Sequence, residues 1–133
     1  MLKNLNYYKL TCVATAFLYF FLFYTLQFEP EKLCSDLGLE GNEIAYLFLR
    51  RASILMFGFG VLLLLGRNVE EVKSKYVISI SVAVCMLGLA LMSALEFVKG
   101  NLSNEVIGPL VIESIIGTIF MLLAISNRTR KAT

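Results

Sequence analysis

The sequence predicts an all-α membrane protein in which four transmembrane helices form an antiparallel bundle with both termini in the cytoplasm. Three observations support this fold class. The 133 residues are 58% hydrophobic and 17% charged, whereas ordinary soluble domains have about 45–50% apolar and about 25% charged residues. Four long apolar segments divide the chain, and lysine and arginine gather in alternate connections between them. We therefore predict one integral membrane domain, residues 1–133, in the cell (inner) membrane.

The four apolar segments place the predicted spans at about residues 10–28, 44–66, 77–98 and 107–125. A helix needs about 20 residues to cross ~30 Å of hydrocarbon, and each segment is about that long. Backbone groups inside lipid must be satisfied within the segment, so each span is predicted to be helical. The first segment follows basic residues as a signal peptide would. Its apolar core exceeds the ~7–15 residues of a signal, however, and no cleavage pattern follows, which predicts a retained helix.

The first connection, EPEKLCSDLGLEGNE, is the longest. Pro30 suits the first position of a helix, where its missing N–H costs nothing. Leu33 and Leu37 are spaced for a short helix on the membrane surface, which Gly38 and Gly41 would end. A solvated loop is the alternative interpretation of this segment.

The distribution of basic residues predicts the orientation of the spans. The N-terminal tail, the second connection and the C-terminal tail together carry eight lysines and arginines, whereas the first and third connections carry two, Lys32 and Lys99. Basic residues near span ends favour the cytoplasmic side. The eight are Lys3, Lys9, Arg67, Lys73, Lys75, Arg128, Arg130 and Lys131.

The composition offers few groups for catalysis or metal binding. Histidine is absent, and the three cysteines, Cys12, Cys34 and Cys85, form no C-x-x-C motif. The commonest general base and metal ligand is therefore missing, as is a paired thiol motif. The net charge of +2 is too small to favour nucleic acid. We predict no catalytic residue, metal or cofactor, and no nucleic-acid partner.

Four ionisable residues lie within the predicted spans: Arg50, Arg51, Glu96 and Glu113. A charge at the centre of a membrane helix costs about 2.5–3.5 kcal/mol, so such residues are rare and commonly functional. The predicted topology places all four in the outer leaflet, and their charges sum to zero. An arginine fork binds a carboxylate in bidentate geometry. We predict that the four form a ligand-binding or ion-pair layer.

Neighbouring residues on a helix differ by about 100°, so the two arginines face different ways. Arg50 shares its face with Ser53 and Gly60 and is predicted to face the bundle interior, whereas Arg51 is predicted to extend to the head groups. A structural salt bridge is the alternative to a binding site for Arg50 and Glu113. The residues predicted to allow close helix packing are Ser53, Gly58, Gly60, Gly88 and Gly117.

The stretch FEPEKLCSDLGLEGNEIAYLFLRRASILMFGFGVLLLLGR, with PLVIESIIG around Glu113, resembles an uncharacterised bacterial family of four-helix integral membrane proteins. In that family a proline-containing outer loop and an L-G-L step lead into a span with arginine and glycines. The layout is more distantly similar to DoxX-like proteins. The resemblance implies a four-helix fold and no particular activity. The sequence departs from the family late in span three, where Glu96 stands instead of a further arginine.

The function predicted from these features is non-enzymatic. The protein would bind a lipophilic or small ligand, such as a lipid, or assemble as a homo-oligomer or within a larger membrane complex. One alternative is a small oligomeric transporter, although small multidrug transporters need an acidic residue in the first span, and this span has none. Another is a membrane enzyme that uses Glu113 or Glu96 as acid or base, with Arg50 stabilising an anion.

Overall fold

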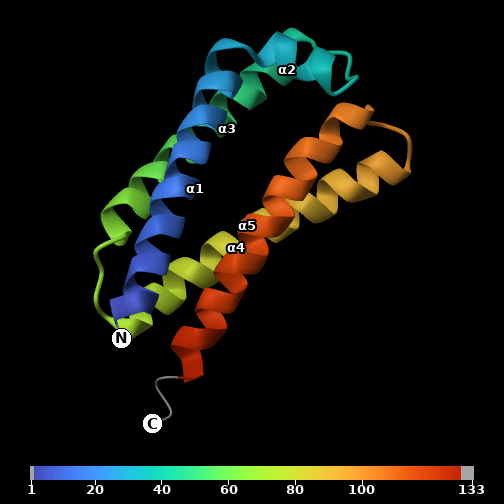
Figure 1. Ribbon diagram of the computed structural model, residues 1–133. Helices are drawn as coiled ribbons and strands as arrows, with labels where there is room; N and C mark the ends of the chain where they lie inside the picture. Colours follow the sequence, from blue (N-terminus) through green and yellow to red (C-terminus); the bar gives the residue numbers. More distant parts are fainter. Residues whose placement is uncertain (1, 130–133) are drawn as a thin grey trace. The chain divides into compact units, whose positions relative to one another are not determined.

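The computed structural model describes the backbone of residues 2–129 and the side chains of residues 7–128, and the described part is helical with no strands. The helices are α1 (Leu2–Phe28), α2 (Pro30–Asp36), α3 (Glu43–Gly66), α4 (Val72–Val98) and α5 (Ile107–Thr129), with a single 3-10 turn, η1 (Asn104–Val106) (Figure 1). The chain divides into unit 1, Met1–Asn68, and unit 2, Val69–Thr133. In unit 1, α1 packs against α3, and in unit 2, α4 packs against α5.

The predicted fold class is confirmed. Four helices of the described chain are long and apolar enough to cross a membrane: Tyr7–Phe28, Glu43–Gly66, Val72–Val98 and Asn104–Arg128. The helices extend beyond the predicted spans, since α1 begins at Leu2 and α4 at Val72. Hydropathy marks only the apolar part of a helix, while the backbone hydrogen bonds continue through its polar first or last turns. Orientation across the membrane stays a prediction.

In unit 1, α1 and α3 pack against each other through a line of buried residues on each helix. The buried residues of α3 are Ser53, Gly60, Leu63 and Gly66. A Cβ added at Gly60 would lie 2.7 Å from a ring atom of Phe20, so this glycine lets α1 approach closely. Aromatic rings of the two helices also pack together, among them Phe20 with Phe57 (5.5 Å between centroids). Near the opposite end, the Tyr8 hydroxyl donates to the Gly66 carbonyl oxygen at 3.3 Å.

The first connection contains a helix, so the helical interpretation of this segment is confirmed. Pro30 occupies its first turn, and Pro30 and Cys34 are buried. The helix ends because Gly38 takes a positive φ of 74°. Two hydrogen bonds close the turn, from Leu39 N to the Cys34 carbonyl and from Gly38 N to the Ser35 carbonyl. This is a Schellman motif, in which glycine adopts the left-handed conformation at little cost.

The start of α3 is fixed by a side-chain cap. The Oδ1 atom of Asn42 accepts a hydrogen bond from the backbone N–H of Ala45 at 2.8 Å. Asparagine is a favoured cap because it satisfies one of the free N–H groups of the first turn. Gly41 lies against the ring of Tyr46, which folds the end of the connection over the first turn of α3.

Unit 2 is a hairpin whose helices approach closely at Gly117. A Cβ added at this residue would lie 2.7 Å from Leu87 Cγ and 3.1 Å from the Leu87 backbone nitrogen. Phe120 and Ala124 continue the buried stripe of α5 at helical spacing. The buried residues of α4 likewise follow helical spacing: Ser79, Val82, Ala83, Met86 and Ala90.

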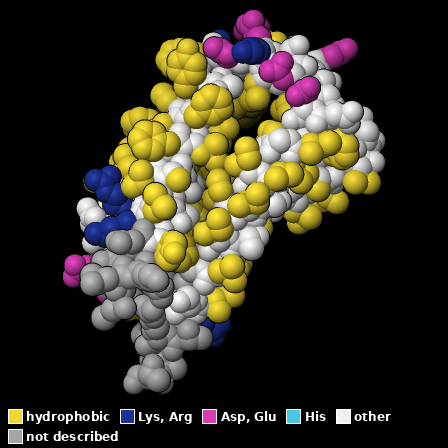
Figure 2. Space-filling model, in the orientation of Figure 1, with side chains coloured by type: hydrophobic (Ala, Val, Ile, Leu, Met, Phe, Trp, Pro, Cys, Tyr) yellow, Lys and Arg dark blue, Asp and Glu magenta, His cyan; other side chains and the backbone are white. Residues whose placement is uncertain are grey.

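Large apolar side chains remain exposed along all four long helices. Examples are Phe17 at 67% exposure, Leu65 at 74% and Val98 at 84%. Figure 2 shows hydrophobic side chains over the visible surfaces of the long helices and acidic side chains gathered around α2. Soluble monomers rarely expose continuous apolar patches of this kind. The exposed stripes therefore suit contact with lipid.

Candidate functional site

The two arginines of α3 are the most unusual groups of unit 1. Both side chains are exposed. Among the described residues, neither guanidinium forms a hydrogen bond or an ion pair. Each lies within a candidate membrane span, about 10–12 Å along the helix from its first residue at a rise of ~1.5 Å per residue. Two cations within a candidate span are unfavourable unless an anion or water meets them.

Arg50 is exposed in unit 1, and its position in the interior of a four-helix bundle stays a prediction. Within unit 1, α1 covers the stripe of α3 that contains Ser53 and Gly60, and Arg50 lies at the edge of that stripe rather than on it. The physical reason is that Ser53 and Gly60 are small enough to meet α1, whereas an arginine side chain extends past the contact toward the start of the helix. Arg51 is also exposed, and its extension to lipid head groups stays a prediction.

Ser53 ties α3 to α1 beside these arginines. Its side chain is fully buried. The hydroxyl lies 2.7 Å from Gln27 Oε1 and 2.6 Å from the Arg50 carbonyl oxygen, and it can donate its one proton to either acceptor. Gln27 is a residue that sequence reasoning missed. A polar side chain inside the first predicted span, residues 10–28, was the available signal.

The end of unit 1 that carries the arginines is acidic overall. Lys32 forms an ion pair with Glu29 at 3.5 Å. Glu43 lies in the first turn of α3, where a carboxylate is favourable to the helix dipole. Figure 2 shows this acidic group around α2. Its members are Glu29, Glu31, Asp36, Glu40 and Glu43.

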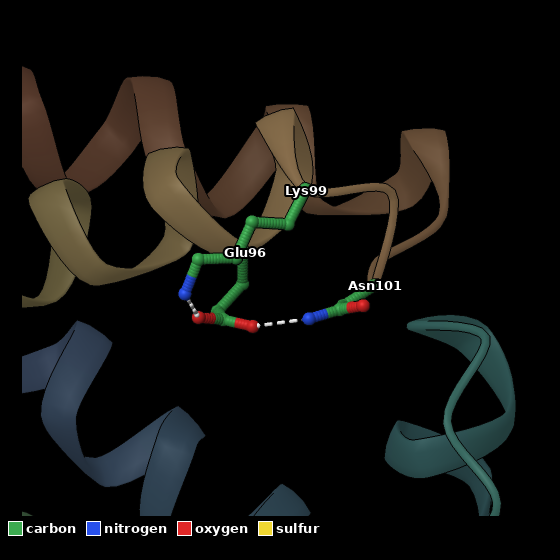
Figure 3. Close-up of polar contacts among 3 residues, drawn as sticks. All are labelled: Glu96, Lys99 and Asn101. Carbon is green, nitrogen blue, oxygen red and sulfur yellow. Dashed lines mark hydrogen bonds and ion pairs between the residues drawn. The ribbon is translucent and has the colours of Figure 1, made fainter.

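Glu96 has partners within its own unit. Its carboxylate accepts a hydrogen bond from Lys99 Nζ at 2.7 Å and another from Asn101 Nδ2 at 2.6 Å (Figure 3). The backbone N–H of Asn101 also donates to the Glu96 carbonyl, and Gly100 has a φ of 79°. Glu96 therefore stabilises the Schellman turn that ends α4. Both of its carboxylate oxygens are engaged, which makes it a structural residue of this hairpin.

Glu113 has the opposite environment. It lies on α5 one helical turn before Gly117, on the stripe that includes Phe120. Its Oε2 atom is buried and has no hydrogen-bond partner among the described residues. A buried carboxyl oxygen without a donor costs free energy, which sets Glu113 apart from Glu96. The predicted pairing of Glu113 with an arginine stays a prediction.

The residues predicted for helix packing fall into two groups. Ser53, Gly60 and Gly117 lie at close contacts within their units. Gly58 and Gly88 instead have open space around an added Cβ, with no atom within 4 Å. Gly58 lies on the exposed face of α3, seven residues after Arg51. It therefore leaves a gap in an exposed apolar stripe.

Two further observations limit the chemistry of the described chain. No group of three or more Cys, Asp or Glu side chains that could hold a metal ion occurs in the described residues. Cys12 and Cys34 are buried, Cys85 is half-buried, and all three are free thiols. Ser79, fully buried on α4, has a hydroxyl without a hydrogen-bond partner among the described residues. Nothing in the sequence distinguishes it from other small residues.

Comparison of the chain with protein-family models, with curated proteins and with solved structures gives no match.

Proposed function

We propose that this chain is a multi-pass protein of the cell (inner) membrane, with both termini in the cytoplasm, that binds a lipophilic ligand through an anionic group held by Arg50 and Arg51. The role is binding rather than catalysis. Membership of the four-helix family that the α3 region resembles is part of this proposal.

The proposal rests on the exposure of the two guanidiniums and on their lack of a partner among the described residues. Both are exposed on a helix long and apolar enough to span a membrane, and neither has a partner among the described residues. Keeping such charges in lipid is unfavourable unless an anion or water meets them. Arginine presents a fork of donors that matches phosphate and carboxylate, and these charge-assisted bonds strengthen where water is scarce. An amphiphile with an anionic head group supplies an anion for the guanidiniums and an apolar tail for the surrounding surface of the helix.

The test is a search for molecules that co-purify with the full chain. We would extract the wild-type protein and an Arg50→Gln/Arg51→Gln variant from membranes in mild detergent and identify the retained small molecules by mass spectrometry. The expected result is an anionic or phosphate-bearing amphiphile that is retained by the wild type and reduced about tenfold in the variant, the effect of one lost charge-assisted bond. Arg67→Gln, which removes an arginine at the other end of α3, is the control. Equal retention by all three proteins would contradict the proposal.

A second candidate is assembly through the predicted Arg/Glu layer, which the unpartnered Oε2 atom of Glu113 favours. If Arg50 and Glu113 are partners, the costs of Arg50→Gln and Glu113→Gln will not add. We would measure thermal unfolding in detergent for both single variants and the double variant. A coupling of roughly 0.5–3 kcal/mol would indicate contact. Strict additivity would rule out the pair and leave the arginines to a ligand.

A further inference from the structure

Charged and apolar side chains follow one another in a definite order along one exposed face of α3. Glu43, Leu47, Ile54 and Gly58 follow one another at spacings of four or seven residues, which places them on one side of a helix. Arg50 and Arg51 flank this line between Leu47 and Ile54. All of these residues are exposed. From the start of α3 inward, the face therefore presents a carboxylate, one leucine, two guanidiniums and then an apolar stripe.

From this order we infer that α3 binds a phospholipid with an ethanolamine head group, with the phosphate at Arg50 and Arg51 and the ammonium at Glu43. This inference rests on the proposed function and names the class of its ligand. In such a lipid the ammonium lies outermost, the phosphate lies deeper and the acyl chains lie deepest. The carboxylate of Glu43 and the guanidiniums of the two arginines carry the opposite charges in the same order.

The spacing along α3 agrees with this assignment. Glu43 precedes Arg50 by seven residues, or about 10.5 Å along the axis. Helical side chains tilt toward the N-terminus, and because an arginine stem is longer than that of Glu43, the guanidiniums lie closer to the Glu43 carboxylate than the backbone spacing. The distance that remains is comparable to the extent of one phosphoethanolamine group. Because Arg50 and Arg51 point about 100° apart, a phosphate over Leu47 lies between them.

The acyl chain has a continuous apolar path below the arginines. Ile54 and Leu55 are 59% and 63% exposed, and Leu62 and Leu65 continue the same side of α3. Gly58 interrupts this stripe with open space, since an added Cβ meets no atom within 4 Å. A chain that follows the helix can occupy this gap and contact the backbone there.

The carboxylates near the start of α3 favour one phospholipid head group over the others. The α2 end of unit 1 carries five carboxylates, and its Lys32 is already paired with Glu29. An anionic head group without an amine, such as glycerol phosphate, would add negative charge to this end. A choline head group brings positive charge but has no N–H to donate to a carboxylate. Ethanolamine supplies both the charge and the donors.

The test uses the full chain in nanodiscs that contain equal amounts of phosphatidylethanolamine, phosphatidylglycerol and phosphatidylcholine with the same acyl chains. Native mass spectrometry would measure which lipids each protein retains after release. We expect the wild type to retain phosphatidylethanolamine above the other two. Arg50→Gln/Arg51→Gln should reduce retention of every lipid about tenfold. Glu43→Gln should keep the phospholipid and lose the preference for ethanolamine, whereas Glu70→Gln, in the α3–α4 connection, should match the wild type.

Gly58→Leu adds a second test that does not depend on charge. Its open surroundings allow the side chain, so the variant should fold and melt like the wild type while it retains less lipid. If Gly58→Leu melts normally and retains lipid as the wild type does, the acyl path is wrong.

The remaining outcomes separate the inference from the proposed function. Arginine-dependent retention of phosphatidylglycerol or phosphatidylcholine at the level of phosphatidylethanolamine would overturn the head-group assignment and leave the proposed function in place. An arginine-dependent co-purified molecule that is not a phospholipid would do the same. If the arginine variant retains lipids and co-purified molecules as the wild type does, both are overturned.

Discussion

The residues that define the candidate site of unit 1 differ mainly in whether they have a local partner. Ser53 is fully buried and hydrogen-bonded to its neighbours, whereas Arg50 and Arg51 are exposed and their guanidiniums form no hydrogen bond or ion pair with a described residue. Ser53 therefore contributes to the contact between α1 and α3, whereas the guanidiniums of the two arginines do not. In unit 2, Glu96 is likewise a structural residue because Lys99 and Asn101 occupy its carboxylate.

Replacement of Ser53 by alanine should lower the stability of the protein. The variant loses the hydroxyl that can donate to Gln27 Oε1 or to the Arg50 carbonyl oxygen, a loss of about 1 kcal/mol. Thermal unfolding of the purified protein in detergent would measure it. Ser81→Ala is the matched control, because the exposed Ser81 hydroxyl bonds only to the Val77 carbonyl of its own helix. Equal melting temperatures for the two variants would show that the Gln27 contact contributes nothing.

At the scale of the elements, glycine decides where helices meet and where turns close. Gly60 and Gly117 permit close approach within the two hairpins. Gly38 and Gly100 take positive φ at the ends of α2 and α4, where each closes a Schellman turn. These are different requirements, space in the first case and backbone conformation in the second.

Gly58 and Gly60, two residues apart on α3, should respond oppositely to the same substitution. Gly60→Leu places a side chain against Phe20 and should destabilise the hairpin by roughly 1–3 kcal/mol, the usual cost of overpacking. Gly58→Leu enters open space and should be tolerated. Thermal unfolding of both variants in the same detergent is the measurement. A loss of stability in Gly58→Leu as large as that of Gly60→Leu would indicate that another surface covers this face.

At the scale of the whole molecule, the charge distribution predicts how the chain crosses the membrane. The basic residues at the ends of α1, α3 and α5 favour the cytoplasm, which places α2 and the end of α4 outside. The structure supplies exposed positions on which to test this orientation, Glu40 in the α2–α3 connection and Asn68 in the α3–α4 connection.

We expect a membrane-impermeant maleimide on intact cells to label Glu40→Cys and not Asn68→Cys, in a background where the three native cysteines are serine. Permeabilised cells should show labelling of both, which controls for reactivity. The reverse pattern on intact cells would mean that the termini lie outside. In that case the proposed lipid would be drawn from the cytoplasmic leaflet.

The sequence by itself determined the fold class and the four helices long enough to span a membrane, and it left the short helix that begins at Pro30 open against a solvated loop. These follow from segment length, apolar content and glycine or proline at helix ends, which are local properties of the chain. It also singled out Ser53, Gly60 and Gly117, because small residues allow helices to approach.

Only the tertiary structure decided which polar groups have partners. The helical period places Arg50 and Ser53 near one face, but a difference of three residues is about 300° of rotation, so packing decides which of the two meets α1. The structure buries Ser53 against Gln27, leaves Arg50 exposed and ties Glu96 to Lys99 and Asn101. Whether two polar side chains form a hydrogen bond depends on the distance between them in the folded protein. For residues on different helices, or on the two sides of a turn, the helical period of the sequence does not predict that distance.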